Sequence, residues 1–184
     1  HAALRNVLGK HVRQAGSLVE SNKLRFDFNH FAAVKPGELR AIEDQVNEQI
    51  FGNLAVSKDV LPYDEAIRRG ALAFFEEKYG DKVRVVKMGD YSVELCGGTH
   101  VQKTGEIGLF KIIGESSVAA GVRRIEAVVG QEALRRLQQL EGQINLVATS
   151  LKVAPGEVAG RVEKLLAQVR DLEKALEQEK RKKI

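Results

Sequence analysis

Apolar residues recur every three or four positions in two stretches of the N-terminal part of the chain, residues 2–12 and 38–51. This spacing gathers the apolar side chains on one face and predicts two amphipathic helices that can cover a sheet. The first helix is expected to end near Gly16, where a run of Gln, Ala, Gly and Ser breaks the pattern. Shorter helices are expected at 63–69 and 71–78.

Elsewhere apolar and polar residues alternate, which is the two-residue period of strands. The alternation predicts one hairpin over 18–28 and a second over 83–95, with Gly89 and Asp90 in its tight turn. Further strands are expected at 54–61, 107–113 and 122–129. Because strands and helices are interspersed without a regular βαβ alternation, the sequence predicts an α+β fold with a mixed, largely antiparallel sheet and covering helices.

The last third of the chain has a different pattern. A helix is predicted over 131–151, Pro155 interrupts it, and apolar residues over 158–176 alternate steps of four and three. These heptads predict a C-terminal coiled-coil arm, and they are too few to decide between an antiparallel hairpin with the preceding helix and dimerisation. The expected domains are therefore 1–130, globular, and 131–184, helical.

Composition excludes several classes of protein. The chain has 184 residues, of which 43% are hydrophobic, so it can build one ordinary core with an appendage. Its net charge of +4 permits a polyanionic partner without demanding one. A single cysteine rules out an internal disulfide, and no long apolar run or secretory signal is visible. We therefore expect a cytoplasmic protein without a membrane role.

The sharpest local signal is the run Cys-Gly-Gly-Thr-His at 96–100, directly after a predicted strand. A thiolate and an imidazole four positions apart can bind one zinc ion, because the two glycines let the backbone turn sharply between them. Cys96 and His100 would be half of a tetrahedral site. Two other interpretations stay open: a buried cysteine beside a surface histidine, and a Cys-His nucleophilic pair without an assignable acidic partner.

Several separated motifs give this run its context. The chain resembles the editing domain shared by alanyl-tRNA synthetases and free-standing alanyl editing proteins over roughly residues 1 to 130. Threonyl-tRNA synthetases have a related domain, but the Arg-Phe-Asp-Phe run at 25–28 and the strand with two arginines at 123–124 resemble the alanyl enzymes. The heptads match the alanyl-tRNA synthetases better than the short stand-alone editing proteins. The matching segments, in chain order, are 1–5, 9–17, 24–28, 96–100, 104–108 and 121–127.

The resemblance implies a zinc site with two further ligands from an H-x-x-x-H motif at the start of the first helix. His1 looks like the histidine just after that motif, so this chain would carry only Cys96 and His100 as metal ligands. An empty or weakly loaded zinc site is therefore expected, unless His11, water or a neighbouring molecule completes it.

The resemblance also implies the activity, which is hydrolysis of seryl- or glycyl-tRNA(Ala) at the acceptor end of the tRNA. Gln14 and Thr99 are the candidates for contacts to the aminoacyl group, although a solvated amide and a turn-capping hydroxyl are nearly as plausible. Arg123 and Arg124 are candidates for tRNA binding, but on a strand they point to opposite faces, so at most one lines the site. His30 is left unassigned.

Two alternatives to a catalytic fragment follow from the same residues. The chain could be a non-catalytic tRNA-binding and interaction module that has lost activity, with an arm that links to a further domain. Separately, a homodimer through the C-terminal region of the full-length parent is a candidate assembly. A generic coiled-coil scaffold with an unrelated α+β head rests on the heptads alone and leaves the run at 96–100 unexplained.

Overall fold

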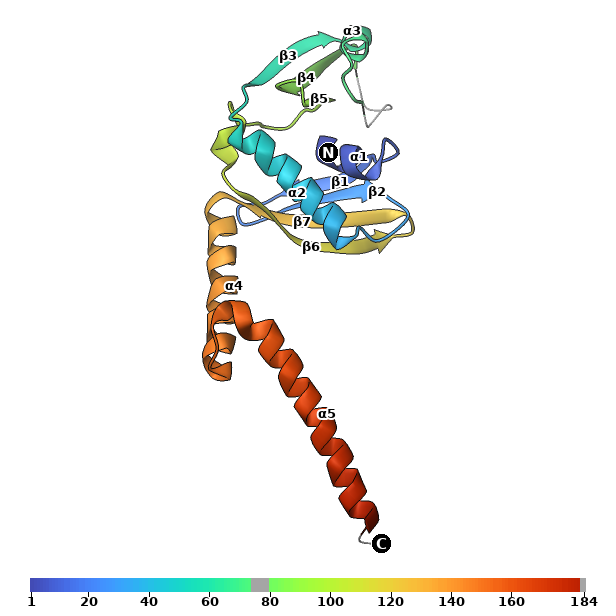
Figure 1. Ribbon diagram of the computed structural model, residues 1–184. Coiled ribbons are helices and arrows are strands. Elements are labelled where there is room, and N and C mark those ends of the chain that lie inside the picture. The colour runs from blue at the N-terminus through green and yellow to red at the C-terminus, as the bar shows by residue number, and fades with distance from the viewer. Residues whose placement is uncertain (74–79, 183–184) are drawn as a thin grey trace. The chain divides into compact units, whose positions relative to one another are not determined.

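The computed structural model describes residues 1–73 and 80–182 (Figure 1). The chain divides into two compact units, His1–Leu134 and Arg135–Ile184, which are described separately below. The first unit mixes helices with two antiparallel sheets, so the predicted α+β class is confirmed. Most of the short helix predicted at 71–78 lies outside the described residues.

The larger sheet of the first unit has four antiparallel strands in the order β1-β2-β7-β6. Helices α1 (Ala2–Leu8) and α2 (Pro36–Phe51) lie against it (Figure 1). Their apolar residues pack with Phe28 and Ile125 of the sheet in one core. The predicted hairpin at 18–28, the helix at 38–51 and the strand at 122–129 are thereby confirmed. The strands are β1 (Gln14–Val19), β2 (Leu24–Asn29), β6 (Phe110–Ala119) and β7 (Val122–Val129).

A smaller sheet of three antiparallel strands, in the order β3-β4-β5, comes between α2 and β6 in the chain. Helix α3 (Tyr63–Arg68) packs on it through Ala66, and a second small core forms there. A 3-10 helix, η2 (Thr104–Ile107), leads back to the larger sheet. The strands are β3 (Val56–Pro62), β4 (Lys82–Met88) and β5 (Ser92–Leu95), which confirms the hairpin predicted at 83–95.

The first helix is shorter than its apolar spacing predicts. It ends at Leu8, and Gln14 begins strand β1 instead of closing a helix near Gly16. The helix stops because Gly9 adopts φ 116°, a left-handed conformation that favours glycine, and a Cβ there would lie 3.0 Å from His11 Nδ1. Pairing of residues 14–19 with β2 then outweighs the local helical spacing.

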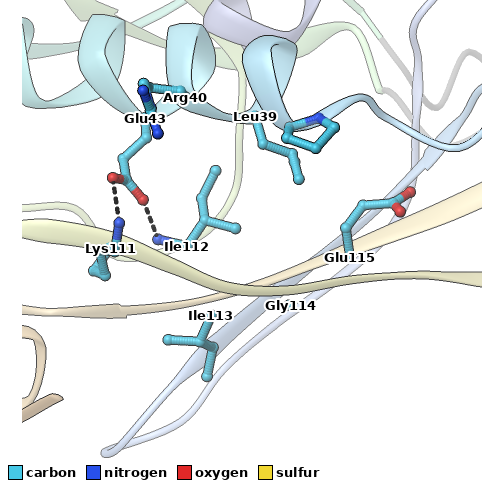
Figure 2. A pocket seen from close by; sticks show the side chains of 9 residues that line it. Leu39, Arg40, Glu43, Lys111, Ile112, Ile113, Gly114 and Glu115 are labelled. Atoms are coloured by element: carbon cyan, nitrogen blue, oxygen red, sulfur yellow. Dashed lines mark hydrogen bonds and ion pairs between the residues drawn. The ribbon is translucent and has the colours of Figure 1, made fainter. Parts of the chain in front are cut away.

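Side chains of α2 satisfy the outer edge of strand β6. Asn47 Nδ2 donates to the carbonyl of Phe110 and Asn47 Oδ1 accepts from its N–H, both at 2.8 Å. Glu43 accepts from the N–H of Ile112 and from Lys111 Nζ, each at 2.7 Å (Figure 2). The backbone groups at the start of this edge strand are therefore bonded by a helix where a further strand would otherwise bind.

Thr104 ties the end of α2 to the segment that follows residues 96–100. Its side chain is buried, at 2% exposure, and its hydroxyl donates to the carbonyl of Gln49 at 2.7 Å. The same oxygen accepts from the N–H of Leu54 at 2.8 Å. The backbone N–H of Val56 also donates to the carbonyl of Gln102, so the return segment runs along the start of β3.

The second unit consists of most of α4 (Gly130–Leu151), the 3-10 turn η3 (Pro155–Glu157) and α5 (Val158–Lys182). The two predicted helices are confirmed, with the break at Pro155. Leu166, Val169, Leu172 and Leu176 along α5 are each at least half exposed, so the predicted coiled coil stays a prediction. A search of the helices in residues 1–73 and 80–182 finds none long and apolar enough to cross a membrane.

Candidate functional site

The loop at 96–100 follows β5 and is held by two basic side chains from the neighbouring strands. Arg84 of β4 donates from Nε to the carbonyl of Cys96 at 2.9 Å and also donates to the carbonyl of Gly98. The N–H of Cys96 donates back to the carbonyl of Arg84 at 3.1 Å. Lys58 of β3 donates to the carbonyl of His100 at 2.9 Å. The loop is thus fixed by its main-chain carbonyls, which leaves its side chains available.

The structure brings Cys96 and His100 together. Cys96 Sγ and His100 Cε1 lie 3.6 Å and 3.9 Å from the point that a Cβ on Gly98 would occupy, so both side chains flank this glycine. Cys96 is a free thiol and half-buried, and His100 Nδ1 is buried without a hydrogen-bond partner among the described residues. The roles of these two residues, as zinc ligands or as a nucleophilic pair, stay predictions.

The electrostatic environment favours a neutral imidazole at His100. Burial lowers the pKa of His100 below its usual 6.5, and the nearby backbone of Gly98 opposes this shift in part. The positive charges of Arg84 and Lys58 lower the pKa further. A neutral imidazole with an unpartnered nitrogen next to a thiol has the donor chemistry that zinc prefers. Within residues 1–73 and 80–182, no third Cys, His, Asp or Glu completes a metal-binding group with them.

The start of the first helix lies close to the strand that precedes this loop. His1, at the N-cap of α1, places Nδ1 3.6 Å from Glu94 Oε2, and Glu94 comes two residues before Cys96. His1 therefore lies beside β5, the strand that leads into the cysteine loop. His11, in contrast, lies against His30, with His11 Nε2 2.9 Å from His30 Nδ1 and the two rings stacked.

The two candidates for substrate contacts stand on different elements. Thr99 is exposed within the loop, between the glycines and His100. Gln14 lies at the start of β1, where its amide donates to Ser17 Oγ at 2.9 Å, so its predicted place at a helix end is wrong. Their predicted roles in substrate binding remain predictions.

Arg123 and Arg124 each bind a different carboxylate. Arg123 holds Glu115 through two hydrogen bonds of 2.6 and 2.7 Å, and Arg124 holds Asp27 in the same two-pronged way at the same distances. These guanidinium groups hold the pKa of Glu115 and that of Asp27 below their usual values. Both arginines therefore form ion pairs within the larger sheet, and their expected contact with tRNA remains a prediction.

Sequence reasoning missed Arg84, Lys58 and Glu94. Arg84 and Lys58 occur on strands with ordinary polar alternation, and many basic residues of the chain share that setting. Nothing in the sequence marks the carbonyls of a distant loop as their partners, since that contact depends on how the strands pair.

The fold and this loop define a class of tRNA synthetase domain. Residues 83–126, which span β4, the cysteine loop and most of the β6–β7 hairpin, match the family described as threonyl and alanyl tRNA synthetase second additional domain. The matched range contains Arg84, Cys96 and His100, so the site just described lies inside the family's own segment.

Longer comparisons narrow this class to one enzyme family. The chain is 52% identical to an alanine–tRNA ligase of Solibacter usitatus over 182 residues, which is 99% of the chain and 21% of that protein. An alanine–tRNA ligase of Acidithiobacillus ferridurans is 55% identical over 181 residues, covering 98% of the chain and 21% of that protein. The chain belongs to the alanine–tRNA ligase family and spans about a fifth of the length of these relatives. The resemblance drawn from the motifs is confirmed.

Proposed function

We propose that this chain is the editing part of an alanine–tRNA ligase and hydrolyses seryl- or glycyl-tRNA(Ala) at the acceptor end. The observation that carries this proposal is the convergence of Cys96 and His100 on Gly98, with a buried, unpartnered nitrogen on His100. Membership of the alanine–tRNA ligase family supports tRNA as the partner. The same convergence would be unexplained in a module that only binds tRNA.

Selection of alanine by size explains the need for such a site. One methylene-sized contact is worth only about 1–3 kcal/mol, and an apolar pocket rejects an added hydroxyl by on the order of 100-fold. Serine and glycine therefore become attached to the alanine tRNA at a measurable rate. A second, hydrolytic site removes them by attack of water on the aminoacyl ester.

Cys96 and His100 would hold zinc through Sγ and an imidazole nitrogen, and the remaining donors are those that the resemblance places just before His1. When bound, the zinc would supply a positive charge that orients the tRNA 3′ end. Arg84 and Lys58 keep the two ligands in place through the loop carbonyls. With two of its own donors, the chain of residues 1–184 is expected to bind zinc weakly, and elemental analysis that finds one tightly held ion per chain would contradict this.

The remaining roles belong to groups that can touch the substrate. The amide of Gln14 and the hydroxyl of Thr99 are proposed to contact the aminoacyl group, where each can donate a hydrogen bond. Arg123 and Arg124 are proposed to contact tRNA from opposite faces of their strand, so that at most one of them lines the site and the other meets phosphate. Each would share its guanidinium with the carboxylate that it already binds.

A deacylation assay tests the proposal. The chain, supplied with zinc, is expected to release serine from seryl-tRNA(Ala), and Cys96→Ala and His100→Ala are expected to lose most of this activity. Thr149→Ala, an exposed change on α4, serves as the matched control and should leave the rate unchanged. The absence of turnover with retained tRNA binding would favour the non-catalytic module instead.

A further inference from the structure

The turn between α4 and α5 encloses a groove of about 630 Å³ that belongs entirely to the second unit. Three basic side chains line it, Lys152 at the end of α4 and Arg161 and Lys164 in the first turns of α5. Gly156 and Gly160 lie between them. The groove is distant in sequence from the loop at 96–100, and the editing proposal does not use any of its residues.

The groove keeps an excess of positive charge, because its lining holds three cations and one carboxylate, Glu157. Among the described residues, no carboxylate forms an ion pair with Lys152, Arg161 or Lys164. Glu157 is the one acidic residue between Glu141 and Glu163 in the sequence, and its carboxylate accepts from the N–H of Ala154 at 3.1 Å. The N-terminal end of α5 adds a partial positive charge to the same place.

Three residues at this turn are unfavourable for the local backbone conformation or for helix stability. Lys152 adopts φ 55°, a left-handed conformation that a residue with a Cβ rarely takes. Gly160 occupies the first turn of α5, where alanine would favour the helix, and Gly156 stands in η3. A Cβ at either glycine would meet nothing within 4 Å, so the glycines are not needed for packing. They leave a flat floor between the cations.

We propose that this elbow groove binds the phosphate backbone of an RNA duplex. Phosphate groups are attracted by three unpaired cations, and a floor without side chains lets a backbone approach the helix closely. The lining contains no aromatic or amide side chain that could stack on a base or read its edge, so the contact is to backbone and not to sequence. In the context of the editing proposal, on which this identification rests, the RNA is tRNA away from its 3′ end.

The test compares two neutralised variants of the full chain. The groove variant combines Lys152→Gln, Arg161→Gln and Lys164→Gln, and the control variant combines Arg170→Gln, Lys174→Gln and Arg181→Gln further along α5. Fluorescence anisotropy with tRNA(Ala) at several salt concentrations measures both the Kd and its salt dependence. The groove variant is expected to raise the Kd by roughly tenfold or more and to reduce the salt slope by about 2–3, one unit for each lost phosphate contact.

The control variant should change the Kd less than about twofold, because its arginines and lysine lie among the carboxylates of α5. Gly160→Leu provides a second test without a change of charge. It fills the floor with a good helix former, so it should weaken binding while the salt slope stays unchanged. Equal effects of the groove and control variants, or no effect of either, would overturn the proposal and leave an acidic protein segment as the competing occupant.

Deacylation of a seryl minihelix that carries only the acceptor stem separates this inference from the editing proposal. The groove variant is expected to deacylate the minihelix at the wild-type rate while it loses affinity for the whole tRNA. If the wild-type chain does not deacylate but the groove variant still loses RNA binding, the editing proposal fails and the elbow groove stands. If editing is normal and the groove variant binds tRNA like the wild type, the elbow groove is refuted.

Discussion

Arg84 is predicted to control the order of the cysteine loop. Arg84→Met keeps a long apolar stem on β4 and removes the hydrogen bonds to the carbonyls of Cys96 and Gly98. A hydrogen bond from a charged group contributes about 1.5–3 kcal/mol, and the lower value applies here because Arg84 is only half-buried. Two such bonds give about 3 kcal/mol, which at 1.4 kcal/mol per factor of ten is roughly a 100-fold change in the opening of the loop.

Two measurements check this magnitude without zinc or substrate. Hydrogen exchange of the amides at 97–100 should speed up by between about 10- and 100-fold, since water replaces part of the lost bonding. Modification of Cys96 by a thiol reagent should speed up by a similar factor. Lys87→Met, an exposed change on the same strand whose lysine pairs with Asp90, should alter neither rate.

A lysine at position 84 should restore part of the order of the cysteine loop. Arg84→Lys keeps the charge but can reach only one of the two carbonyls at a time, so intermediate rates are expected. If Arg84→Met folds normally by circular dichroism and exchanges at 97–100 within about twofold of the wild type, the arginine does not order the loop. The loop would then owe its conformation to its glycines and to Lys58.

Three further predictions concern stability. Burial first, and the charge of the neighbouring His11 second, hold the pKa of His30 below 6.5. The contribution of His30 to folding stability is therefore complete above about pH 6.5 and is lost as the pH falls through its lower folded pKa. His30→Gln should flatten the dependence of Tm on pH between about 7.5 and 5, and identical curves for both proteins would count against this. Thr104→Val should cost about 2–4 kcal/mol in denaturant unfolding, because two buried backbone groups lose their partner, whereas the exposed Thr149→Val should cost little. Arg124→Lys keeps the charge but loses the two-pronged contact with Asp27, so lower stability in denaturant unfolding is expected, while the retained charge keeps the tRNA affinity within about twofold. A large loss of affinity at normal stability would show that phosphate binding needs the guanidinium geometry itself.

The helices and hairpins with strong periodicity could be predicted from the sequence. Helix α2 and the β4–β5 hairpin follow from spacing and turn residues, because their local preferences agree with the tertiary contacts that they make. The first helix could not be delimited in this way. Val12 continues the helical spacing and is fully buried, but it reaches the core from the segment beyond Gly9, which local periodicity does not reveal.

The first strand of the β6–β7 hairpin, β6, shows the same limit on a smaller scale. It was expected at 107–113 but begins at Phe110, since η2 and the left-handed Gly108 occupy the start of that range. Its true beginning is set by Asn47, which bonds both backbone groups of Phe110 from a helix 63 residues earlier in the chain. No local pattern encodes so distant a partner.

The candidate site divides along similar lines. Cys96 and His100 could be found because a short loop carries both donors and the glycines between them. The residues that hold this loop come from β3 and β4, and their identity depends on the pairing of strands. The positions of the two candidate ligands can thus be predicted from the sequence, while the residues that support them cannot.

The contact of α2 with the edge of β6 also determines how the domain can tolerate change. Both ends of the segment between Gly52 and Leu109 meet at this contact. The smaller sheet and its cysteine loop are therefore an insertion between α2 and β6, and the contact that joins these two elements does not include them. Lengthening a turn within that insertion leaves the Asn47 to Phe110 contact, and with it the register of the larger sheet, unaltered. The cysteine loop can therefore change in sequence and length while the register of the larger sheet is retained.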